Sequence, residues 1–591
     1  MSDGFSSSSS FGVAGAGGNV QVVVVSEGFG TETVSGGAAF PAGTTLTLPA
    51  DGSALSTVAA LDAAATGGTL NTTTDAILAP AVTGDVNVLM VESQKKPVSV
   101  PAGYGVIANL SPLSALSPFS TPTISTSGSL ATTVLGGLGG MTVWDNSANE
   151  TVYTGGGDSN VIGMSATVME SLDVVLSGMN EVVAVGIGDA TITGGGYFNT
   201  IWGSGSSGQS NLVVDLVQGS SSVMAGMGSN TIDLGGTSDV IFGGYGTNND
   251  TISGANDIYV AGSGTSSVTA GASDVIFAGS NTMDATIGGA GAIFVGSTGN
   301  DTINASTGAT GWGGSGTMNF ISSGNITIIG GSGATTSIQN SGTGDYFNNG
   351  AGVMTVSGGT APATITETWA GKGGMLVNAG ANGGDTINMT EGNTTVVAGS
   401  AGNSVNFYGN ASGNVWLAQG NTVDLASGGY VAVNDTTAAV SGGNLIDAQG
   451  DTGTANITFG TGGDTVIGGA GNNIYMPVVP ASSHAASMSV SFGTGSNELV
   501  LNPQNTSAFS SLNIYNYNPN RDVIDFNGFG STIPAQRAAI FAALNLATPN
   551  GQPMGSTNFS TGGMNVTLYA GPSASSQTPL PKINLSHFIT T

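Results

Sequence analysis

The chain has 591 residues, of which 100 are glycine and none is cysteine, and its formal net charge is −29. Six Lys and Arg residues cannot form the cationic surface that nucleic acids require, so a nucleic-acid partner is excluded. The absence of Cys excludes disulfides, and no apolar run reaches the roughly 18 residues of a transmembrane helix. An acidic surface instead favours cations, calcium above all outside a cell.

Residues 1–130 are predicted to form an N-terminal, mainly β domain with one short helix. The uncharged stretch "VQVVVV" (Val20–Val25) indicates a strand that could add to the open edge of a neighbouring sheet. The Ala-rich stretch Ala54–Gly68 follows a possible N-cap and predicts the helix. The N-terminus lacks a basic region and a continuous apolar core, so we expect no cleaved secretory signal peptide.

Residues 131–479 are predicted to form a repeat array. Four similar stretches begin at Ser238, Asn256, Ser273 and Gly291, at spacings of 18, 17 and 18 residues. Each contains a short apolar strand, a glycine turn, a Thr/Ile strand and a second glycine turn. Such short strands bury enough surface only when coils stack about 4.8 Å apart and every strand pairs with those above and below. The predicted fold class is therefore all-β, a parallel β-solenoid or β-roll with coils of about 18 residues.

Residues 480–591 are predicted to form a C-terminal cap with one helix and a probable secretion region. The stretch "IPAQRAAIFAALNL" (Ile533–Leu546) predicts the helix, because it is rich in helix-forming residues and has a proline near its first turn. The segments "MNVTLYAG" and "PKINLSHFITT" predict closing strands. A solenoid needs such a cap, because its end exposes unpaired backbone groups.

Four nonapeptides carry a resemblance to a known family: "GSTGNDTIN" (Gly296–Asn304), "GANGGDTIN" (Gly380–Asn388), "FGTGGDTVI" (Phe459–Ile467) and "GGAGNNIYM" (Gly468–Met476). They resemble the tandem glycine-rich repeats of the RTX family of β-roll proteins. The later segment "NPNRDVIDFNGFG" (Asn518–Gly530) resembles the segment that closes many RTX arrays. The resemblance implies Ca²⁺ bound between coils by the sixth-position aspartate and turn carbonyls. It also implies type I secretion from a Gram-negative cell, guided by an uncleaved C-terminal region.

The residue at the sixth position decides how well each turn would bind calcium. It is Asp301, Asp385 or Asp464 in three of the nonapeptides but Asn473 in the fourth. An amide oxygen brings no charge and is a poorer calcium ligand, whereas stacked Asn side chains can hydrogen-bond from coil to coil. We therefore predict an array stabilised largely by its own stacking, with calcium at selected turns. Asp464 with Asn473 is the favoured pair, because their nonapeptides are in tandem.

A separate set of metal candidates recurs once per coil and consists of Asp239, Asp257 and Asp274. Stacked carboxylates about 5 Å apart repel one another unless a cation lies between them. The alternative is that these residues flank exposed turns and are screened by solvent. Both interpretations stay open at this point.

The sequence offers no catalytic or cofactor-binding residue. Between Met141 and Met476 it has one Lys (Lys372), no Arg and no His, so the cationic groups of a polysaccharide lyase are missing. The two histidines, His484 and His587, lie outside the array and are interpreted as structural or surface residues. Five tryptophans lie in or beside strands and either stack on sugars or fill the solenoid's core and corners: Trp144, Trp202, Trp312, Trp369 and Trp416.

Taken together, these features favour a non-enzymatic structural protein, secreted to the surface of a Gram-negative bacterium. We expect it to self-assemble into a surface layer (S-layer) or fibre and to bind Ca²⁺ at some solenoid turns. The alternative is a monomeric adhesin or biofilm matrix protein that binds cell-surface or matrix polysaccharide. A polysaccharide-active enzyme is the least favoured class.

Overall fold

A computed structural model of the chain describes six early strands and most residues from 97 onwards. The early strands are at 9–15, 18–25, 30–35, 44–48, 70–73 and 87–91. The later described ranges are 97–100, 102, 104–109, 122–128, 131–136, 140–155, 157–163, 170–205, 210–339, 344–367, 374–380, 382–399, 402–435, 443–460, 463–478, 487–502, 511–527, 556–561, 564–573 and 588–589. The chain divides into two compact units, residues 1–293 (unit 1) and 294–591 (unit 2).

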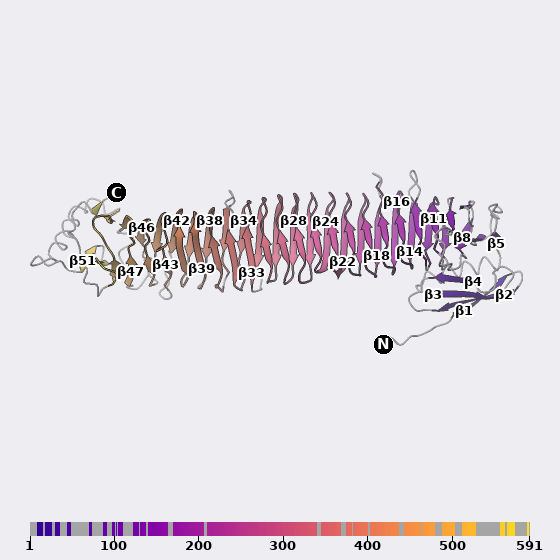
Figure 1. Ribbon diagram of the computed structural model, residues 1–591, viewed down its shortest axis with the longest axis horizontal. Helices are drawn as coiled ribbons and strands as arrows, with labels where there is room; N and C mark the ends of the chain where they lie inside the picture. The colour runs from indigo at the N-terminus through magenta and orange to yellow at the C-terminus, as the bar shows by residue number, and fades with distance from the viewer. Residues whose placement is uncertain are drawn as a thin grey trace, which may run out of the picture. The chain divides into compact units, whose positions relative to one another are not determined.

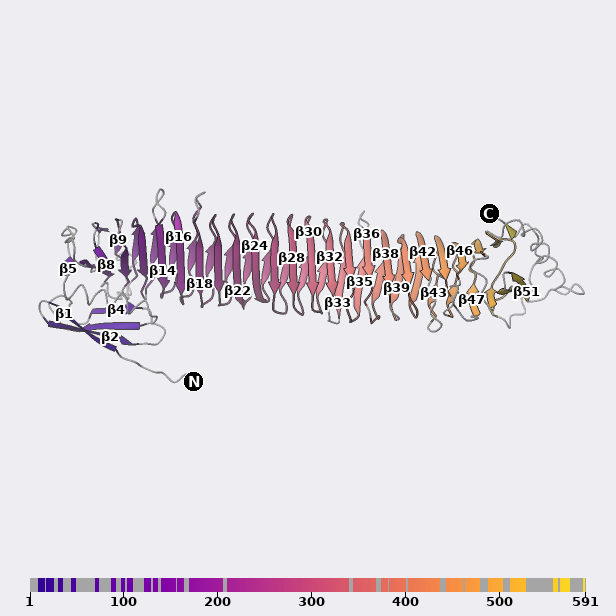
Figure 2. The same cartoon turned by 180° about the vertical axis from the view of Figure 1, so that it is seen from behind.

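The predicted fold class is confirmed. Between residues 123 and 477 the chain forms a parallel β-solenoid of about 17 turns, with coils of about 18 residues. Within the described ranges the regular structure consists of strands, and no helix occurs. The helices predicted at Ala54–Gly68 and Ile533–Leu546 lie outside the described residues. Figures 1 and 2 show the successive strands of each unit from opposite sides.

Unit 1 contains two parallel sheets, which we name sheets B and C, and each coil contributes one strand to each. Sheet B consists of β5 (Leu70–Thr73), β6 (Asn87–Val91), β8 (Tyr104–Asn109), β10 (Thr132–Leu135), β12 (Asn149–Tyr153), β14 (Glu170–Leu176), β16 (Gly188–Gly194), β18 (Leu212–Leu216), β20 (Asn230–Leu234), β22 (Asn248–Ala255), β24 (Ser266–Ala272) and β26 (Met283–Ile287). Sheet C consists of β7 (Val98–Ser99), β9 (Thr123–Ser125), β11 (Thr142–Asp145), β13 (Asn160–Gly163), β15 (Val182–Ala184), β17 (Thr200–Trp202), β19 (Ser222–Met224), β21 (Val240–Phe242), β23 (Ile258–Val260) and β25 (Val275–Phe277). Strand β27 (Ile293–Val295) crosses the boundary of the units.

Unit 2 has the same two-sheet plan, and we name its sheets D and E. Sheet D consists of β28 (Asn300–Ala305), β30 (Thr317–Ser322), β32 (Thr335–Gln339), β34 (Met354–Ser357), β36 (Gly374–Asn378), β38 (Asn393–Ala398), β40 (Ser412–Leu417), β42 (Tyr430–Asp435), β44 (Thr454–Phe459), β46 (Asn472–Pro477), β48 (Asn497–Val500), β50 (Val523–Asp525) and β53 (Phe588–Ile589). Sheet E consists of β29 (Thr310–Trp312), β31 (Thr327–Ile329), β33 (Asp345–Asn349), β35 (Ala363–Glu367), β37 (Thr386–Met389), β39 (Ser404–Gly409), β41 (Thr422–Ser427), β43 (Leu445–Asp447), β45 (Thr465–Ile467), β47 (Ser487–Ser491), β49 (Ser511–Tyr515) and β52 (Met564–Tyr569), with β51 (Ser556–Thr561) antiparallel to β52.

The core forms because equivalent residues of successive coils pair in register and point to the same side of the sheet. Asn230 of β20 pairs with Asn248 of β22, which pairs with Ser266 of β24, so equivalent residues recur every 18 positions. Along each short strand the middle residue points inward and is fully buried, as Ile241 and Tyr259 are. Because every inward side chain packs on its equivalents in adjacent coils, strands of three residues become stable.

In consecutive coils of unit 1 a residue in the left-handed conformation lies two positions before the next short strand. Ser238, Asn256 and Ser273 have φ values of 62°, 64° and 60°, and Gly291 has 80°. These four residues begin the stretches from which the period was predicted, so the predicted turns and their positive φ are confirmed. The turn tolerates Ser and Asn as well as Gly, because short polar side chains also adopt this conformation.

The described start of the chain forms a separate antiparallel sheet (sheet A) of β1 (Ser9–Gly15), β2 (Gly18–Val25), β3 (Gly30–Ser35) and β4 (Thr44–Leu48). Strand β2 contains the stretch Val20–Val25, which was predicted to add to a neighbour's open edge. It pairs with β1 on one side and β3 on the other. That prediction is wrong, because the backbone groups of β2 are already hydrogen-bonded on both sides.

Parallel stacking begins before residue 131, where the array was predicted to start. Strand β8 pairs in parallel with β10, and β6 pairs in parallel with β8. These early strands carry the register of sheet B although the sequence around them lacks the glycine-rich signature. Glycine marks the tight turns of a coil, and it is not needed for the strands themselves to pair.

Candidate functional site

The residue before each sheet C strand forms a buried column, which we call the turn ladder. Its members directly before β21, β23 and β25 are the predicted metal ligands Asp239, Asp257 and Asp274, each fully buried. The Oδ1 of Asp257 accepts the amide hydrogen of Asp239 at 2.8 Å, and the Oδ1 of Asp274 accepts that of Asp257 at 3.0 Å. Each of these carboxylates thus accepts a backbone amide of the neighbouring coil, which offsets part of the repulsion between them. Burial first, and the charge of Asp257 after it, still raise the pKa of Asp239 and Asp274.

Unit 2 has an equivalent turn ladder in which three Asn residues, Asn403, Asn421 and Asn444, lie between Asp385 and Asp464. The Oδ1 of Asp385 accepts the amide hydrogen of Ala363 at 2.8 Å, and the Oδ1 of Asp464 accepts that of Asn444 at 2.8 Å. Between them, Asn403 accepts from Asp385 at 3.0 Å in the same way. The Asp carboxylate and the Asn side-chain amide are interchangeable here, because each presents an oxygen that accepts the backbone N–H of the preceding coil.

A second column of buried residues, which we call the strand ladder, lies near the start of the strands in sheets B and D and points inward. In unit 1 the Nδ2 of Asn230 donates to the Oδ1 of Asn248 at 2.9 Å. In unit 2 the Nδ2 of Asn473 donates to the Oδ1 of Asn497 at 3.3 Å. These bonds confirm the prediction that neutral Asn side chains link one coil to the next.

The structure separates the two residues that the tandem nonapeptides seemed to pair. Asp464 precedes β45 in sheet E, whereas Asn473 lies in β46 of sheet D. One nonapeptide is half a coil, so consecutive repeats occupy different sheets. Asp301 lies in β28, is 4% exposed, and pairs in register with Met318. Its neighbour in that column is therefore apolar.

The predicted calcium ligands are largely occupied by amide hydrogens. In three of them the second carboxylate oxygen accepts one further bond: Asp274 from Gly271 at 2.6 Å, Asp385 from Gly380 at 2.9 Å and Asp464 from Gly460 at 2.9 Å. Calcium requires about six to eight oxygen ligands, and these three residues offer it no free carboxylate oxygen. The second oxygens of Asp239 and Asp257 are buried without a hydrogen-bond partner. Within the described ranges no cluster of three or more His, Cys, Asp or Glu residues is arranged to hold a metal. Calcium at the turns stays a prediction.

Asp239 gives that prediction a direct test, because its Oδ2 has no hydrogen-bond partner and burial raises its pKa to about 6. Asp239→Asn keeps an oxygen for the Ser221 amide, which now donates to Oδ1 at 2.7 Å, and removes a buried charge. We expect its melting temperature at pH 8 to equal or exceed that of the wild type. Asp239→Ala should lose about 1–3 kcal/mol, because the buried amide is left without an acceptor.

Calorimetric melting in calcium and in chelator distinguishes this role from metal binding. If the turn ladder is self-sufficient, chelator shifts neither the wild type nor Asp239→Asn. A wild-type melting temperature that rises with calcium, and no longer does so in Asp239→Asn, would establish Asp239 as a ligand, because a ligand of the folded state must stabilise it.

Sequence reasoning missed a pair of buried acids in unit 1, Asp145 and Glu150, which are 1% and 2% exposed. The Oε2 of Glu150 accepts from the Thr126 hydroxyl at 2.6 Å and lies 3.0 Å from the Ser147 hydroxyl. The amide of Ser147 donates to Asp145 Oδ1 at 2.9 Å. Burial first, and the adjoining Asp145 second, raise the pKa of Glu150 to about 9, so Glu150 is protonated at neutral pH.

Two further buried acids were also missed. Glu181 precedes β15 in the turn ladder, and burial raises its pKa to about 8. Asp250 of β22 points into the coil, where burial raises its pKa to about 7 against the lowering effect of the Tyr259 hydroxyl. The burial of Asp250 follows from the register between coils, because Asp250 pairs with Ile232, whose side chain points inward in the preceding coil.

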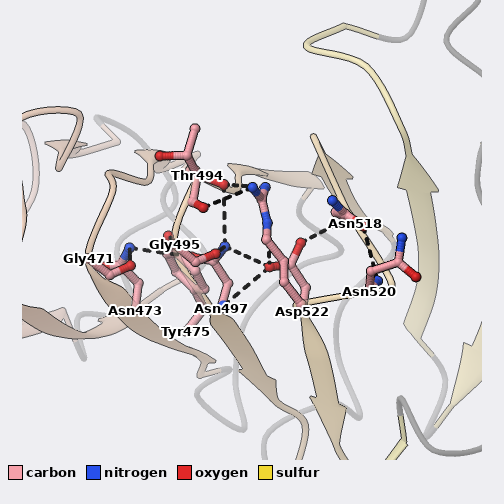
Figure 3. A network of polar contacts seen from close by, with 11 residues as sticks. Gly471, Asn473, Tyr475, Thr494, Gly495, Asn497, Asn518, Asn520 and Asp522 are labelled. Atoms are coloured by element: carbon pink, nitrogen blue, oxygen red, sulfur yellow. Dashed lines mark hydrogen bonds and ion pairs between the residues drawn. The ribbon is translucent and has the colours of Figure 1, made fainter.

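The segment that resembles the closing segment of RTX arrays ends the strand ladder of unit 2 (Figure 3). Asp522 Oδ1 accepts from the Nδ2 of Asn497 at 2.8 Å, and its Oδ2 accepts from the amide of Asn518 at 2.7 Å. The Nε of Arg521 lies 3.2 Å from Asp522 Oδ1. Arg521 also donates to the carbonyls of Gly493 and Thr494, so it fastens this segment to the preceding coil.

Arg521 also borders a cleft of about 590 Å³ that includes Gly469, Phe492, Tyr517 and Asn518 in its lining. Arg521 is the only Lys or Arg in the part of the chain that the structure describes. Its donors already bind two carbonyls and Asp522, so the guanidinium serves the cap and does not present a free cation to a ligand. His484, His587, Lys372 and Trp369 lie outside the described residues.

Comparison with known proteins gives no relative. No family model, no curated protein and no solved structure matches the chain. Its function must therefore be argued from its own residues. In the described ranges no helix is long and apolar enough to cross a membrane.

The four described tryptophans point outward. Trp144, Trp202, Trp312 and Trp416 are 37%, 55%, 47% and 47% exposed. They do not fill the core or the corners, which were the more usual positions considered from the sequence. The core instead uses Phe and Tyr, such as Phe294, Phe407 and Tyr259.

Proposed function

We propose that this protein is a non-enzymatic structural protein that self-assembles into an extracellular layer or fibre. The observation that supports it most is the arrangement of its buried acids. In the turn ladders, Asp239, Asp274, Asp385 and Asp464 accept backbone amides of neighbouring coils. Carboxylates placed in this way stabilise stacking and do not face a substrate.

The outward faces of the sheets add to this support. In unit 1 one outward column of sheet B places an exposed, uncharged side chain in each of five consecutive coils: Thr191, Val213, Thr231, Asn249 and Ser267. A regular, repetitive surface suits contact with many identical neighbours better than recognition of one small molecule.

The resemblance to RTX repeats supports type I secretion to the surface of a Gram-negative cell, and this is part of the proposal. The same resemblance is the reason for proposing calcium at some turns. Because Asp274, Asp385 and Asp464 already accept two amide hydrogens each, the assembly we propose does not depend on calcium at these residues.

The alternative is a monomeric adhesin or biofilm matrix protein that binds polysaccharide. The outward tryptophans favour it, since Trp202 and Trp312 are about half exposed and aromatic faces stack on sugar rings. Few polar side chains surround Trp202, because its neighbours along sheet C are Ala184 and Met224. Sugars are usually oriented by polar groups, so this surface fits a glycan less well.

Negative-stain electron microscopy of the purified full-length chain tests the proposal. We expect ordered sheets or fibres, because the repeating faces of one copy present equivalent contacts to the next. The same preparation is examined with calcium and with chelator, and its mass is followed by light scattering. Persistent monomers under both conditions, together with retention on insoluble polysaccharide, would favour the adhesin instead.

A further inference from the structure

A continuous apolar column runs along the outward face of sheet C in unit 1. We call it the apolar stripe and define it by Ala184, Trp202, Met224, Phe242, Val260 and Phe277, one residue from each of six consecutive coils. The four largest side chains remain 41–55% exposed. Monomeric proteins seldom leave so many adjacent large apolar side chains in water.

The stripe has a strained aromatic residue at its border. Phe198, in the turn that precedes β17, has a φ of 62° and is 56% exposed. Its equivalents in neighbouring coils are the small polar residues Asn180 and Ser220. A bulky residue in the left-handed region costs on the order of 1–2 kcal/mol, and Phe198 stays more than half exposed, with the ring of Tyr197 centred 6.3 Å from its own. Such strain at an exposed aromatic points to a contact made outside the chain.

Charge identifies the kind of partner. The stripe contains no charged residue, whereas the outward face of sheet B in the same unit exposes Asp173, Asp189, Asp215, Asp233 and Asp284. The whole chain has a net charge of −29. Two copies therefore repel one another through most of their surface and can approach with least repulsion through sheet C.

The geometry of the stripe also matches a second copy. Both copies have the same coil spacing of about 4.8 Å, so the side chains of one stripe can lie between those of the other throughout its length. If each large apolar side chain offers about 100 Å², the four large side chains of the stripe and Phe198 offer on the order of 500 Å² per copy. Two copies would then bury about 1,000 Å² in total, which is the lower end of the range for a specific interface.

We propose that two copies of this chain pair face to face through the apolar stripe, in an isologous contact. The pairing deepens the proposed function, because it supplies one of the contacts that a layer or fibre needs. It requires only the described face of unit 1, so it can be tested separately from layer formation.

The test compares two charge substitutions in the full-length chain by analytical ultracentrifugation. Phe242→Glu places a carboxylate in the middle of the stripe, and Thr231→Glu places one on the exposed face of sheet B, in the strand directly before it in the chain (β20). We expect dimers of the wild type and of Thr231→Glu, and at least about 30-fold weaker dimerisation of Phe242→Glu. Equal melting temperatures of the two variants show that the coil survives.

The effect of salt gives a second, independent readout. Because pairing brings two acidic chains together, raising the ionic strength should strengthen the dimer. A dimer that weakens with salt would contradict contact through an uncharged face. A wild type that stays monomeric at every concentration, or a Phe242→Glu variant that dimerises like Thr231→Glu, would overturn the proposal.

Two outcomes separate this proposal from the proposed function. If Phe242→Glu is monomeric but the wild type forms dimers without sheets or fibres, face pairing stands and the layer proposal fails. If Phe242→Glu still forms the wild type's ordered assemblies and its dimers, layer formation stands and face pairing fails. Retention of a monomeric wild type on insoluble polysaccharide, lost in Trp202→Glu, would assign the stripe to a glycan and overturn pairing.

Discussion

Acidification from pH 8 to pH 5 is expected to raise the melting temperature of this protein. Burial raises the pKa of Glu150 to about 9 and that of Glu181 to about 8. A raised folded-state pKa means that the folded chain holds a proton that the unfolded chain releases above about pH 4.5. The stability that these two protons contribute is therefore complete below about pH 4.5 and is lost as the pH rises through the folded-state pKa.

Each pH unit in this window contributes about 1.4 kcal/mol per site, so Glu150 alone is worth about 4 kcal/mol between pH 5 and pH 8. The opposite trend, loss of stability in acid, comes from carboxylates whose folded-state pKa is lowered by cations or by hydrogen bonds. Within the described residues the one ion pair is Arg521 with Asp522. In the turn ladder burial outweighs the amide hydrogen bonds and raises the pKa of Asp239, Asp257 and Asp274. Differential scanning calorimetry at a series of pH values measures the effect.

Glu150→Gln separates this effect from the general relief of charge repulsion in acid. The amide imitates the protonated acid and keeps an oxygen for the hydroxyls of Thr126 and Ser147, which lie 2.6 and 3.0 Å from Oε2. We expect the variant to melt higher than the wild type at pH 8 and equally at pH 5. If the variant instead follows the wild-type pH profile throughout, Glu150 is ionised in the folded protein and the argument fails.

The period of the solenoid could be predicted from the sequence because turns and strands repeat locally. Ser238, Asn256 and Ser273 were recognised as starts of equivalent stretches, and each has the same left-handed backbone. Nothing beyond neighbouring residues was needed for that prediction. The helices predicted at Ala54–Gly68 and Ile533–Leu546 lie outside the described residues and stay predictions.

The role of the stacked acids could not be predicted, since it depends on which atoms of the next coil face them. Asp257 was considered opposite another carboxylate, but its Oδ1 meets the amide of Asp239. Glu150 was not noticed at all, because an acid in a turn-rich stretch is usually solvated. Its burial depends on register: Glu150 pairs with Thr132 and Leu172, whose side chains also point inward.

Gly246→Ala is expected to cause a large loss of stability in the coils of unit 1. A Cβ at Gly246 would lie 1.9 Å from the carbonyl oxygen of Gly228, one coil before, and one at Gly264 would lie 1.7 Å from that of Gly246. Gly246 does not have a positive φ, so the expected effect is steric. Forcing these turns apart should cost about 3 kcal/mol or more.

Gly235→Ala is the matched control in the same unit. Its Cβ would have its nearest neighbour, the Cα of Val217, at 3.5 Å, an ordinary contact. Midpoints of urea unfolding, followed by circular dichroism, compare the two variants, because a long repeat array need not unfold in one step. Equal midpoints would mean that coils separate at the turns without cost. A large loss confined to Gly246→Ala would show that the backbone contacts between turns set the coil spacing, on which both ladders and the apolar stripe depend.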